Sequence, residues 1–310
     1  MSHPRAESSA QPDLTDGVVT LVPRQQTDRG GARMHPFAVI FEQDEVGAVC
    51  VTEVDDSLGR LTWGLAPRST GRGFATKAVQ LLVDYAFRGL GPERVEAYVD
   101  PANERAMRVA TRSGLLREGV VRGHGAGADG RRDQVLFARL ATDPPISEPE
   151  SFRSLLNSFL PRKRAISQML VRDPDDRVLL CRLTYKQDWD LPGGVVEVHE
   201  SPQLAVSREV HEELALDITA GRLLLTDWLP SWSGWDDALC LVFDGGVHDP
   251  SIVDGIVKQA REIRAAQFCT MDEVREQCAD FTARRIASAL ANTGAGGPAY
   301  TESGRSSEQR

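Results

Sequence analysis

The stretch Gly193–Ile218 constrains this chain most, because its residues have the pattern of a glycine loop, a turn and a helix. Ser201 and Pro202 are favourable residues for the N-cap and the first helical position. The helix is predicted to end at Leu214. Residues three or four apart share a helix face, which brings three carboxylates together: Glu209, Glu212 and Glu213. An apolar stripe beside them is predicted to face the core.

Clustered carboxylates repel one another, so a sequence that keeps them is predicted to hold a cation. Hard divalent cations such as Mg²⁺ favour carboxylate oxygens and keep several waters for phosphate substrates. The alternative interpretation is a solvated acidic helix face with ordinary surface pairs, and three glutamates alone would favour that alternative. Arg208 and Glu200 form an opposite-charge pair that is predicted to join the helix to the preceding loop.

The spacing of these residues decides between the two interpretations. Gly194 is followed by five residues, Glu200, seven residues and then Arg208–Leu216, which reads REVHEELAL. This pattern resembles the Nudix box, G-x5-E-x7-R-E-U-x-E-E-x-G-U, where U is an aliphatic residue. Ala215 stands where the family has glycine, a departure that concerns the end of the helix more than the chemistry.

The resemblance implies a hydrolase that uses Mg²⁺ or Mn²⁺ to cleave a nucleoside diphosphate linked to another group, or a related pyrophosphate. It also implies the metal ligands, which are three carboxylates and one loop carbonyl: Glu209, Glu212, Glu213 and Gly193. Arg208 and Glu200 would orient the helix and the loop. Glu262 is a candidate for a further ligand or base on its position alone. The sequence does not choose which glutamate accepts the proton.

Composition limits the other function classes. The chain has 310 residues, 41% hydrophobic and 26% charged, which suits two globular domains. Its net charge of −9 argues against binding to a nucleic acid duplex. No apolar run approaches the roughly twenty residues of a membrane span, and the polar N-terminus has no signal core. Five scattered cysteines favour reduced, buried thiols in a cytoplasmic protein over a disulfide framework.

The N-terminal half contains a second motif. After a predicted disordered tail (1–13) come short apolar runs typical of antiparallel strands: Val18–Val22, Phe37–Phe41, Val46–Val51 and Leu61–Leu65. A glycine-rich loop and a strongly amphipathic helix follow. A glycine loop that opens a helix can direct free N–H groups at a phosphate, and Arg68 and Arg72 add positive charge.

The loop is similar to the acetyl-CoA loop of the GNAT acetyltransferases, R/Q-x-x-G-x-G/A, through Arg68, Gly71 and Gly73. The likeness continues through the strand Arg94–Val99 and an asparagine-led helix, and it covers 14–142. It implies acetyl-CoA as co-substrate, with the loop on the pyrophosphate and the asparagine near the pantetheine arm. The implied binding residues are Arg68, Gly71, Arg72, Gly73, Phe74 and Asn103.

Two departures from the GNAT pattern concern the acceptor side. The segment between Val22 and Phe37 is too short for the family's two helices, at about eleven residues each. The tyrosine that often serves as general acid is missing after Asp100. The candidates to replace it are Glu53, Glu118 and His124, although a lone histidine in a glycine-rich loop is more often simply exposed.

The expected fold class is α+β with two domains. The first is a mixed sheet with flanking helices, shortened at its N-terminal helices. A linker (143–152) leads to the second, a Nudix α/β/α sandwich (153–290), and a disordered tail (291–310) follows. Trp232 and Trp235 lie in a loop between predicted strands, where they either stack on a nucleobase or pack against the sheet.

Three hypotheses about function remain open. The chain is a pyrophosphohydrolase fused to an active acyltransferase, or a hydrolase whose N-terminal half only binds acyl-CoA and regulates it. In the third, both halves are non-catalytic binding modules. The complete set of box glutamates argues against the third, and the short acceptor segment keeps the second open. The expected partners are a small nucleotide or pyrophosphate and acyl-CoA.

Overall fold

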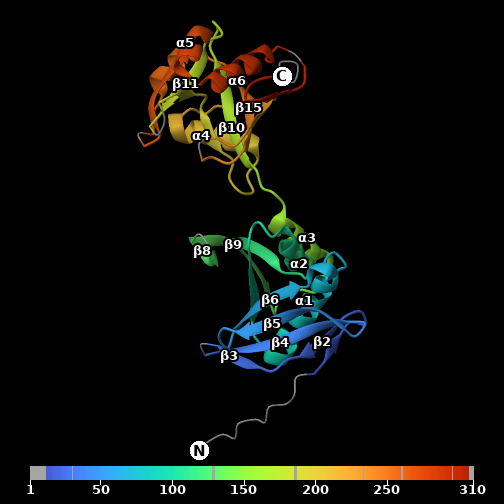
Figure 1. Cartoon of the computed structure of the whole chain (residues 1–310). Helices are drawn as coiled ribbons and strands as arrows, with labels where there is room; N and C mark the ends of the chain where they lie inside the picture. Colours follow the sequence, from blue (N-terminus) through green and yellow to red (C-terminus); the bar gives the residue numbers. More distant parts are fainter. Residues whose placement is uncertain are drawn as a thin grey trace, which may run out of the picture. The chain divides into compact units, whose positions relative to one another are not determined.

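The computed structural model describes residues 12–29, 31–127, 130–184, 187–232, 234–259, 261–294 and 296–306. Contacts divide the chain into two compact units, Met1–Pro161 and Arg162–Arg310. Each unit has its own sheet and its own hydrophobic core (Figure 1). The expected two-domain α+β class is therefore confirmed, and the two units are described separately below.

The N-terminal unit is built on one mixed sheet with the strand order β1-β2-β4-β5-β6-β7-β9-β8, and β3 pairs with β4. All pairings are antiparallel except that of β6 with β7. The strands are β1 (Leu14–Thr15), β2 (Thr20–Pro23), β3 (Thr27–Arg29), β4 (Ala32–Phe41), β5 (Asp44–Glu53), β6 (Leu58–Leu65), β7 (Arg94–Val99), β8 (Leu116–Gly127) and β9 (Gly130–Leu140).

Helix α1 (Phe74–Tyr85) buries its apolar stripe against this sheet and continues into a π-helical turn, η2 (Ala86–Leu90), before α2 (Glu104–Arg112). The structure has β3 between β2 and β4, and no helix among the described residues of that segment. The expectation that the domain is shortened at its N-terminal helices is thus confirmed. Only Leu58–Arg60 pair with β7, so β6 and β7 separate just before the glycine-rich loop.

The domain boundary differs from the predicted one. Residues 143–152 were expected to be a linker and the second domain to begin at 153, but α3 (Pro149–Phe159) lies in the N-terminal unit. Leu155 is buried there, and Ser158 Oγ accepts a hydrogen bond from the N–H of Arg117, 3.2 Å away. The apolar pattern of this segment does not indicate on which domain it packs. In the structure the division between the units falls after Pro161.

The C-terminal unit has a second mixed sheet with the order β12-β11-β10-β15-β14-β17, to which β13 adds beside β10 and β16 beside β11. The β10–β15 and β14–β17 pairs are parallel. The strands are β10 (Arg164–Arg172), β11 (Val178–Leu183), β12 (Trp189–Asp190), β13 (Gly193–Val195), β14 (Leu223–Leu229), β15 (Ala238–Val247), β16 (Ile263–Cys269) and β17 (Ala299–Glu302).

Helices cover both faces of this sheet, as the sandwich expectation requires (Figure 1). Strand side chains alternate between faces. Met169 and Val171 of β10 therefore pack toward α4 (Pro202–Leu214), whereas Leu170 packs toward α5 (Met271–Gln277) and α6 (Asp280–Ala291). Helix α4 is thus held against one face of the sheet by a layer of apolar contacts.

The expected disorder of the C-terminal tail (291–310) is wrong for part of it. Strand β17 pairs in parallel with β14, and Thr301 Oγ1 donates to Asp227 Oδ1 at 2.7 Å. The Gly- and Ser-rich composition offers few apolar residues, but a buried carboxylate on β14 provides polar partners instead. Most of the predicted N-terminal tail (1–13) lies outside the described residues.

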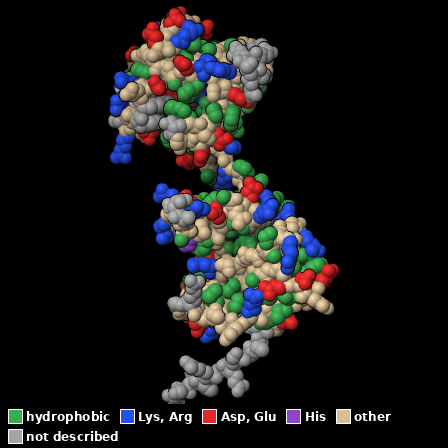
Figure 2. Space-filling model, in the orientation of Figure 1, with side chains coloured by type: hydrophobic (Ala, Val, Ile, Leu, Met, Phe, Trp, Pro, Cys, Tyr) green, Lys and Arg blue, Asp and Glu red, His purple; other side chains and the backbone are tan. Residues whose placement is uncertain are grey.

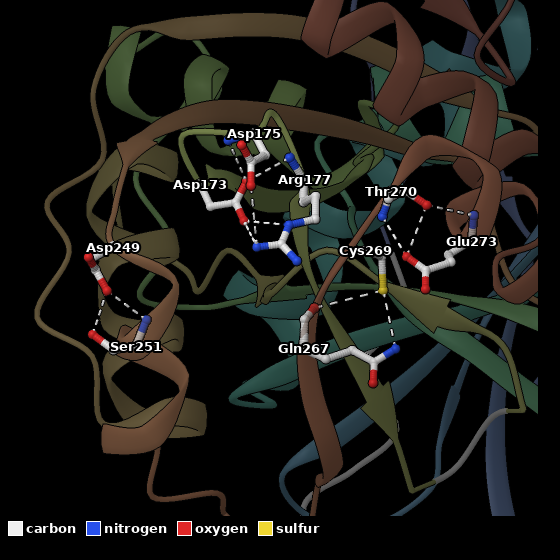
Figure 3. A network of polar contacts seen from close by, with 9 residues as sticks. All are labelled: Asp173, Asp175, Arg177, Asp249, Ser251, Gln267, Cys269, Thr270 and Glu273. Atoms are coloured by element: carbon white, nitrogen blue, oxygen red, sulfur yellow. Dashed lines mark hydrogen bonds and ion pairs between the residues drawn. The ribbon is translucent and has the colours of Figure 1, made fainter.

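Short polar contacts close the connections at one end of the sheet (Figure 3). Asp173 accepts from the backbone N–H of Arg177 and from its Nε at 2.7 Å, which closes the β10–β11 turn. Thr270 and Glu273 form a capping box that starts α5. These local contacts fix the β10–β11 turn and the start of α5 near the beginning of β11.

The distribution of charged side chains and the state of the cysteines can be compared with the expectations from composition. On the face drawn in Figure 2, acidic and basic side chains are interspersed over both units. Among the described residues, no helix combines the length and apolar character needed to cross a bilayer. All five cysteines are free and buried, which confirms that expectation.

Candidate functional site

Helix α4 has the predicted start and end. Ser201 is its N-cap residue, without a side-chain cap, and Pro202 occupies the first turn. At its C-terminus Ala215 adopts the left-handed conformation, φ 55° and ψ 33°, and its N–H donates to the carbonyl of His211 at 2.8 Å. The helix therefore ends at the position where the Nudix pattern has glycine, although a Cβ is present.

Replacing Ala215 by glycine is expected to stabilise the C-terminal unit by about 0.5–1 kcal/mol, because glycine removes the cost of a left-handed alanine. Denaturant unfolding followed by tryptophan fluorescence measures this, since four of the five tryptophans lie in that unit. Ala287→Gly at an exposed position of α6 is the matched control and should lose about 1 kcal/mol. An Ala215→Gly midpoint at or below wild type would contradict the expectation.

Arg208 is the centre of the acidic face. Its Nε and Nη2 donate to the two oxygens of Glu200 at 2.8 and 2.9 Å, and its Nη1 donates to Glu212 at 3.0 Å. The same Nη1 lies 3.1 Å from Glu209. One guanidinium thus joins the loop to α4 and balances three carboxylates, as predicted for the Arg208–Glu200 pair.

The two loop glycines make room for this arrangement. A Cβ on Gly194 would lie 2.6 Å from the carboxyl carbon of Glu209, so the carboxylate rests directly on the glycine backbone. Burial raises the pKa of Glu209, and Arg208 opposes the rise. Gly193 has φ 132°, and a Cβ there would lie 2.2 Å from the carbonyl oxygen of Ser167.

Glu213 is the buried member of the set, with a relative exposure of 5%. Its Oε2 accepts from the N–H of Gly193 at 3.4 Å. Burial raises the pKa of Glu213 to about 7, the Gly193 contact opposes the rise, and nearby negative charges add to it: Glu209, Glu262 and Asp190. Glu262, expected on position alone, therefore lies close enough to act electrostatically on the helix glutamates.

Replacing Glu213 by glutamine should stabilise the metal-free protein in a pH-dependent way. The folded pKa of about 7 exceeds the unfolded value of 4.5, so the buried carboxylate destabilises the fold when it is ionised. This destabilisation is small near pH 4.5 and reaches its full size only above pH 7. The expected gain in unfolding free energy is about 3 kcal/mol near pH 8 and less than about 1 kcal/mol near pH 5. Urea unfolding in a chelator tests this. An equal gain at both pH values would show that the carboxyl group does not titrate in this range.

The donor set suits a hard divalent cation, because the carboxylates of Glu209 and Glu213 lie against the backbone of Gly194 and Gly193, which carry no side chains. Among the described residues, however, no three acidic, histidine or cysteine side chains converge on one point. Arg208 currently supplies the positive charge. A cation would therefore have to replace Arg208 at Glu209 or Glu212.

The two loop tryptophans are on the surface. Trp232 is 64% exposed and Trp235 58% exposed, so the packing alternative does not hold for them. The Trp235 ring lies 4.9 Å from the guanidinium carbon of Arg164, and Trp232 meets the edge of Phe281 at 6.0 Å. Both rings therefore present surface to solvent.

The sequence analysis missed a buried polar network on the other side of the sheet. Arg285 of α6 donates from Nε to Asp227 at 2.9 Å and from Nη1 to Gln168 at 3.0 Å. Gln168 in turn donates from Nε2 to Asp190 at 2.8 Å. No spacing rule joins residues so far apart in the chain, and the only sequence signal was an arginine within the buried stripe of α6.

In the N-terminal unit, the glycine-rich loop is shaped as its sequence predicts. Gly71 and Gly73 are left-handed, with φ 81° and 82°, and Gly73 is the N-cap of α1. Arg72 lies over the rings of Phe41 and Phe74 at 4.8 and 4.6 Å, and Arg68 is exposed. Asn103 is the N-cap of α2, where its Oδ1 accepts from the N–H of Ala106.

The three candidate replacements for the missing tyrosine differ in their surroundings. Arg94 binds both oxygens of Glu118 and lowers the pKa of that carboxyl group, which makes it a poor base. Glu53 is paired with His35. The His124 ring stacks on Tyr98 at 3.9 Å, a residue of β7 where β6 and β7 separate.

Comparisons with known proteins match the two units separately. A family model described as an acetyltransferase (GNAT) domain matches residues 4–116, and one described as a NUDIX domain matches residues 161–290. A "MutT-like protein" of Streptomyces ambofaciens is 32% identical over 130 residues, which are 42% of this chain and 78% of that protein.

The N-terminal unit is similar to an "Uncharacterized N-acetyltransferase p20" of Bacillus licheniformis, with 32% identity over 105 residues. That match covers 33% of this chain and 59% of the relative, so the chain spans less than two thirds of its length. A crystal structure of a MutT protein from Methanosarcina mazei Go1 has a TM-score of 0.38 and 19% identity, covering 44% of this chain and 100% of that one.

Proposed function

We propose that this chain, a member of the Nudix family that also contains a GNAT acetyltransferase domain, is a divalent-metal-dependent pyrophosphohydrolase. Its substrate would be a nucleoside diphosphate linked to another group, or a related pyrophosphate. The observation that supports this most directly is the acidic face of α4 resting on the Gly193–Gly194 backbone, with Arg208 joining it to Glu200.

The residues of the face divide between holding a cation and joining the loop to the helix. A Mg²⁺ or Mn²⁺ ion would supply charge neutralisation at the bridging phosphates. Glu209, Glu212 and Glu213 offer carboxylate oxygens for it, and Gly193 offers its carbonyl. Arg208 holds Glu200 with two hydrogen bonds and so fixes the loop against the helix.

The remaining roles concern the proton and the substrate. Glu213 is a candidate acceptor for the proton of the attacking water, because its pKa of about 7 lies near neutral pH. Glu262 is the second candidate, from its exposed position near the helix glutamates. Trp232 and Trp235 are proposed to stack on a nucleobase, and their exposure supports this role. Stacking of this kind is worth roughly 1–3 kcal/mol per base.

A hydrolysis screen tests the proposal. The purified chain with Mg²⁺ would be incubated with nucleoside triphosphates, nucleotide sugars, ADP-ribose, dinucleoside polyphosphates and coenzyme A, and the products identified by mass. Metal-dependent turnover of one class is the expected result. No turnover of any class by folded, metal-loaded protein would contradict the proposal and leave a binding module.

The N-terminal unit supports a second function, the binding of acyl-CoA. The left-handed glycines at the start of α1 and the separation of β6 from β7 together favour a ligand with a phosphate group and an extended arm. Coenzyme A is therefore expected to raise the unfolding temperature of this unit. Acetylation of an amine panel would then separate an active acyltransferase from a regulatory domain, and the absence of protection by coenzyme A would contradict both.

A further inference from the structure

The buried network of the C-terminal unit, on the face of the sheet opposite α4, forms a closed set of contacts. Asp227 is 0% exposed and Arg285 2% exposed. Asp227 Oδ2 accepts from Arg285, while Oδ1 accepts from Thr301 Oγ1 at 2.7 Å and from the N–H of Gly304 at 2.9 Å. Both oxygens of the carboxylate are thereby fixed by α6 and by the C-terminal segment.

Arg285 also fixes the side chain of Gln168. An arginine offers only donors and an ionised aspartate only acceptors, so the amide of Gln168 has one allowed orientation between them. Its Oε1 accepts from Arg285 Nη1 at 3.0 Å, and its Nε2 donates to Asp190 Oδ1 at 2.8 Å. Cys240 Sγ also donates to Oε1, at 3.2 Å, so Arg285 and Cys240 together hold the amide in this orientation.

Asp190 connects Gln168 to the loop segment Asp190–Gly193, which leads to the acidic face of α4. The same Oδ1 accepts from the N–H of Leu191 at 2.9 Å, and the carbonyl of Pro192 accepts from the N–H of Met169 at 3.0 Å. Gln168 is also the register partner of Gly193. The segment from Asp190 to Gly193 is therefore held by the strand that bears Gln168, and it ends at the N–H that faces Glu213.

Stability alone gives no reason for such a network. Buried ion pairs are often replaced by apolar residues with little loss of stability. Arg285 Nη2 has no hydrogen-bond partner among the described residues, which adds a cost. The strand that completes the network, β17, lies outside residues 161–290, the part of the chain that the NUDIX family model matches.

We propose that β17 and the Asp227–Arg285 pair position the Asp190–Gly193 backbone for the hydrolytic site on the opposite face of the sheet. Arg285, Asp227 and Thr301 are positioning residues in this scheme, because none of them contacts the acidic face. The proposal rests on the proposed hydrolase function, but its structural part can be measured without substrate.

The first test uses two matched substitutions at one position. Thr301→Val removes the hydroxyl group and keeps the shape, whereas Thr301→Ser keeps the hydroxyl group. Amide hydrogen exchange in the peptide 189–195 is expected to accelerate about tenfold in Thr301→Val and to stay near wild type in Thr301→Ser. Exchange in β15 should be unchanged in both, which excludes a general loss of stability.

The second test is the double variant Asp227→Leu with Arg285→Met, which removes both charges and so leaves no unpaired ion. It is expected to fold, to show faster exchange in 189–195 and to lower kcat about tenfold with little change in KM. Unchanged exchange in 189–195 in Thr301→Val, or equal effects of Val and Ser, would overturn the inference. Inactive wild-type protein would contradict the proposed function alone, since the exchange measurement remains decisive.

Discussion

Replacing Glu209 by glutamine is expected to lower kcat/KM for pyrophosphate hydrolysis by more than about 100-fold while leaving the fold intact. Substitutions of residues that only support a metal ligand typically cost 10–100-fold, so loss of a ligand itself should exceed that range. The fold should survive because glutamine has the same shape against Gly194 and because burial already disfavours the charged form. Arg208 keeps its contacts with Glu200 and Glu212.

The measurement combines kinetics on the substrate found in the screen with a Mg²⁺ titration. Glu276→Gln on α5 is the matched control, because it removes an exposed carboxylate of the same length from another helix. The control should keep full activity and Mg²⁺ affinity. If Glu209→Gln retained the kcat/KM of the control, Glu209 would not be part of the metal site.

Replacing Gly193 by alanine is expected to destabilise the C-terminal unit by more than about 3 kcal/mol and to abolish hydrolysis with it. The Cβ would lie 2.2 Å from the carbonyl oxygen of Ser167 and 2.9 Å from the Cα of Gln168. Both are backbone atoms of β10, so no side-chain rotation can relieve the overlap. The φ of 132° adds strain for any residue with a Cβ.

Denaturant unfolding followed by tryptophan fluorescence measures this effect. Gly255→Ala is the control, because its Cβ would meet no atom within 4 Å and its φ is not in the left-handed region. That control should change stability by less than about 0.5 kcal/mol. Equal midpoints for the two variants would mean that β13 does not approach β10 as closely as described.

Local spacing was sufficient to predict the acidic face and the loop beneath it. The spacing of Gly194, Glu200 and Arg208 matches a known motif. Helical geometry places Glu209, Glu212 and Glu213 on one face of the helix that follows. The end of α4 after Leu214 and the glycine loop that opens α1 also follow from neighbouring residues, whereas the left-handed conformation of Ala215 did not, because alanine replaces the family's glycine there. The short segment before Phe37 excluded two helices by length alone.

The contacts between distant segments could not be predicted in this way. The residues of α3 from 153 onward were assigned to the second domain but pack in the first, since their apolar pattern does not say which partner buries Leu155. The exposure of Trp232 and Trp235 and the approach of Glu262 to the helix glutamates also depend on how loops return to the sheet.

The sequence by itself therefore determined the two domain families, the acidic helix face and the glycine-rich loops. Each of these was read from residues that lie close together in the chain. Only the tertiary structure decided that Arg208 balances three carboxylates, that Thr301 and Arg285 share Asp227, and that a glycine- and serine-rich tail forms β17. A buried charge requires a partner, and the fold can supply that partner from any part of the chain. Short-range periodicity therefore cannot predict which residue the partner is.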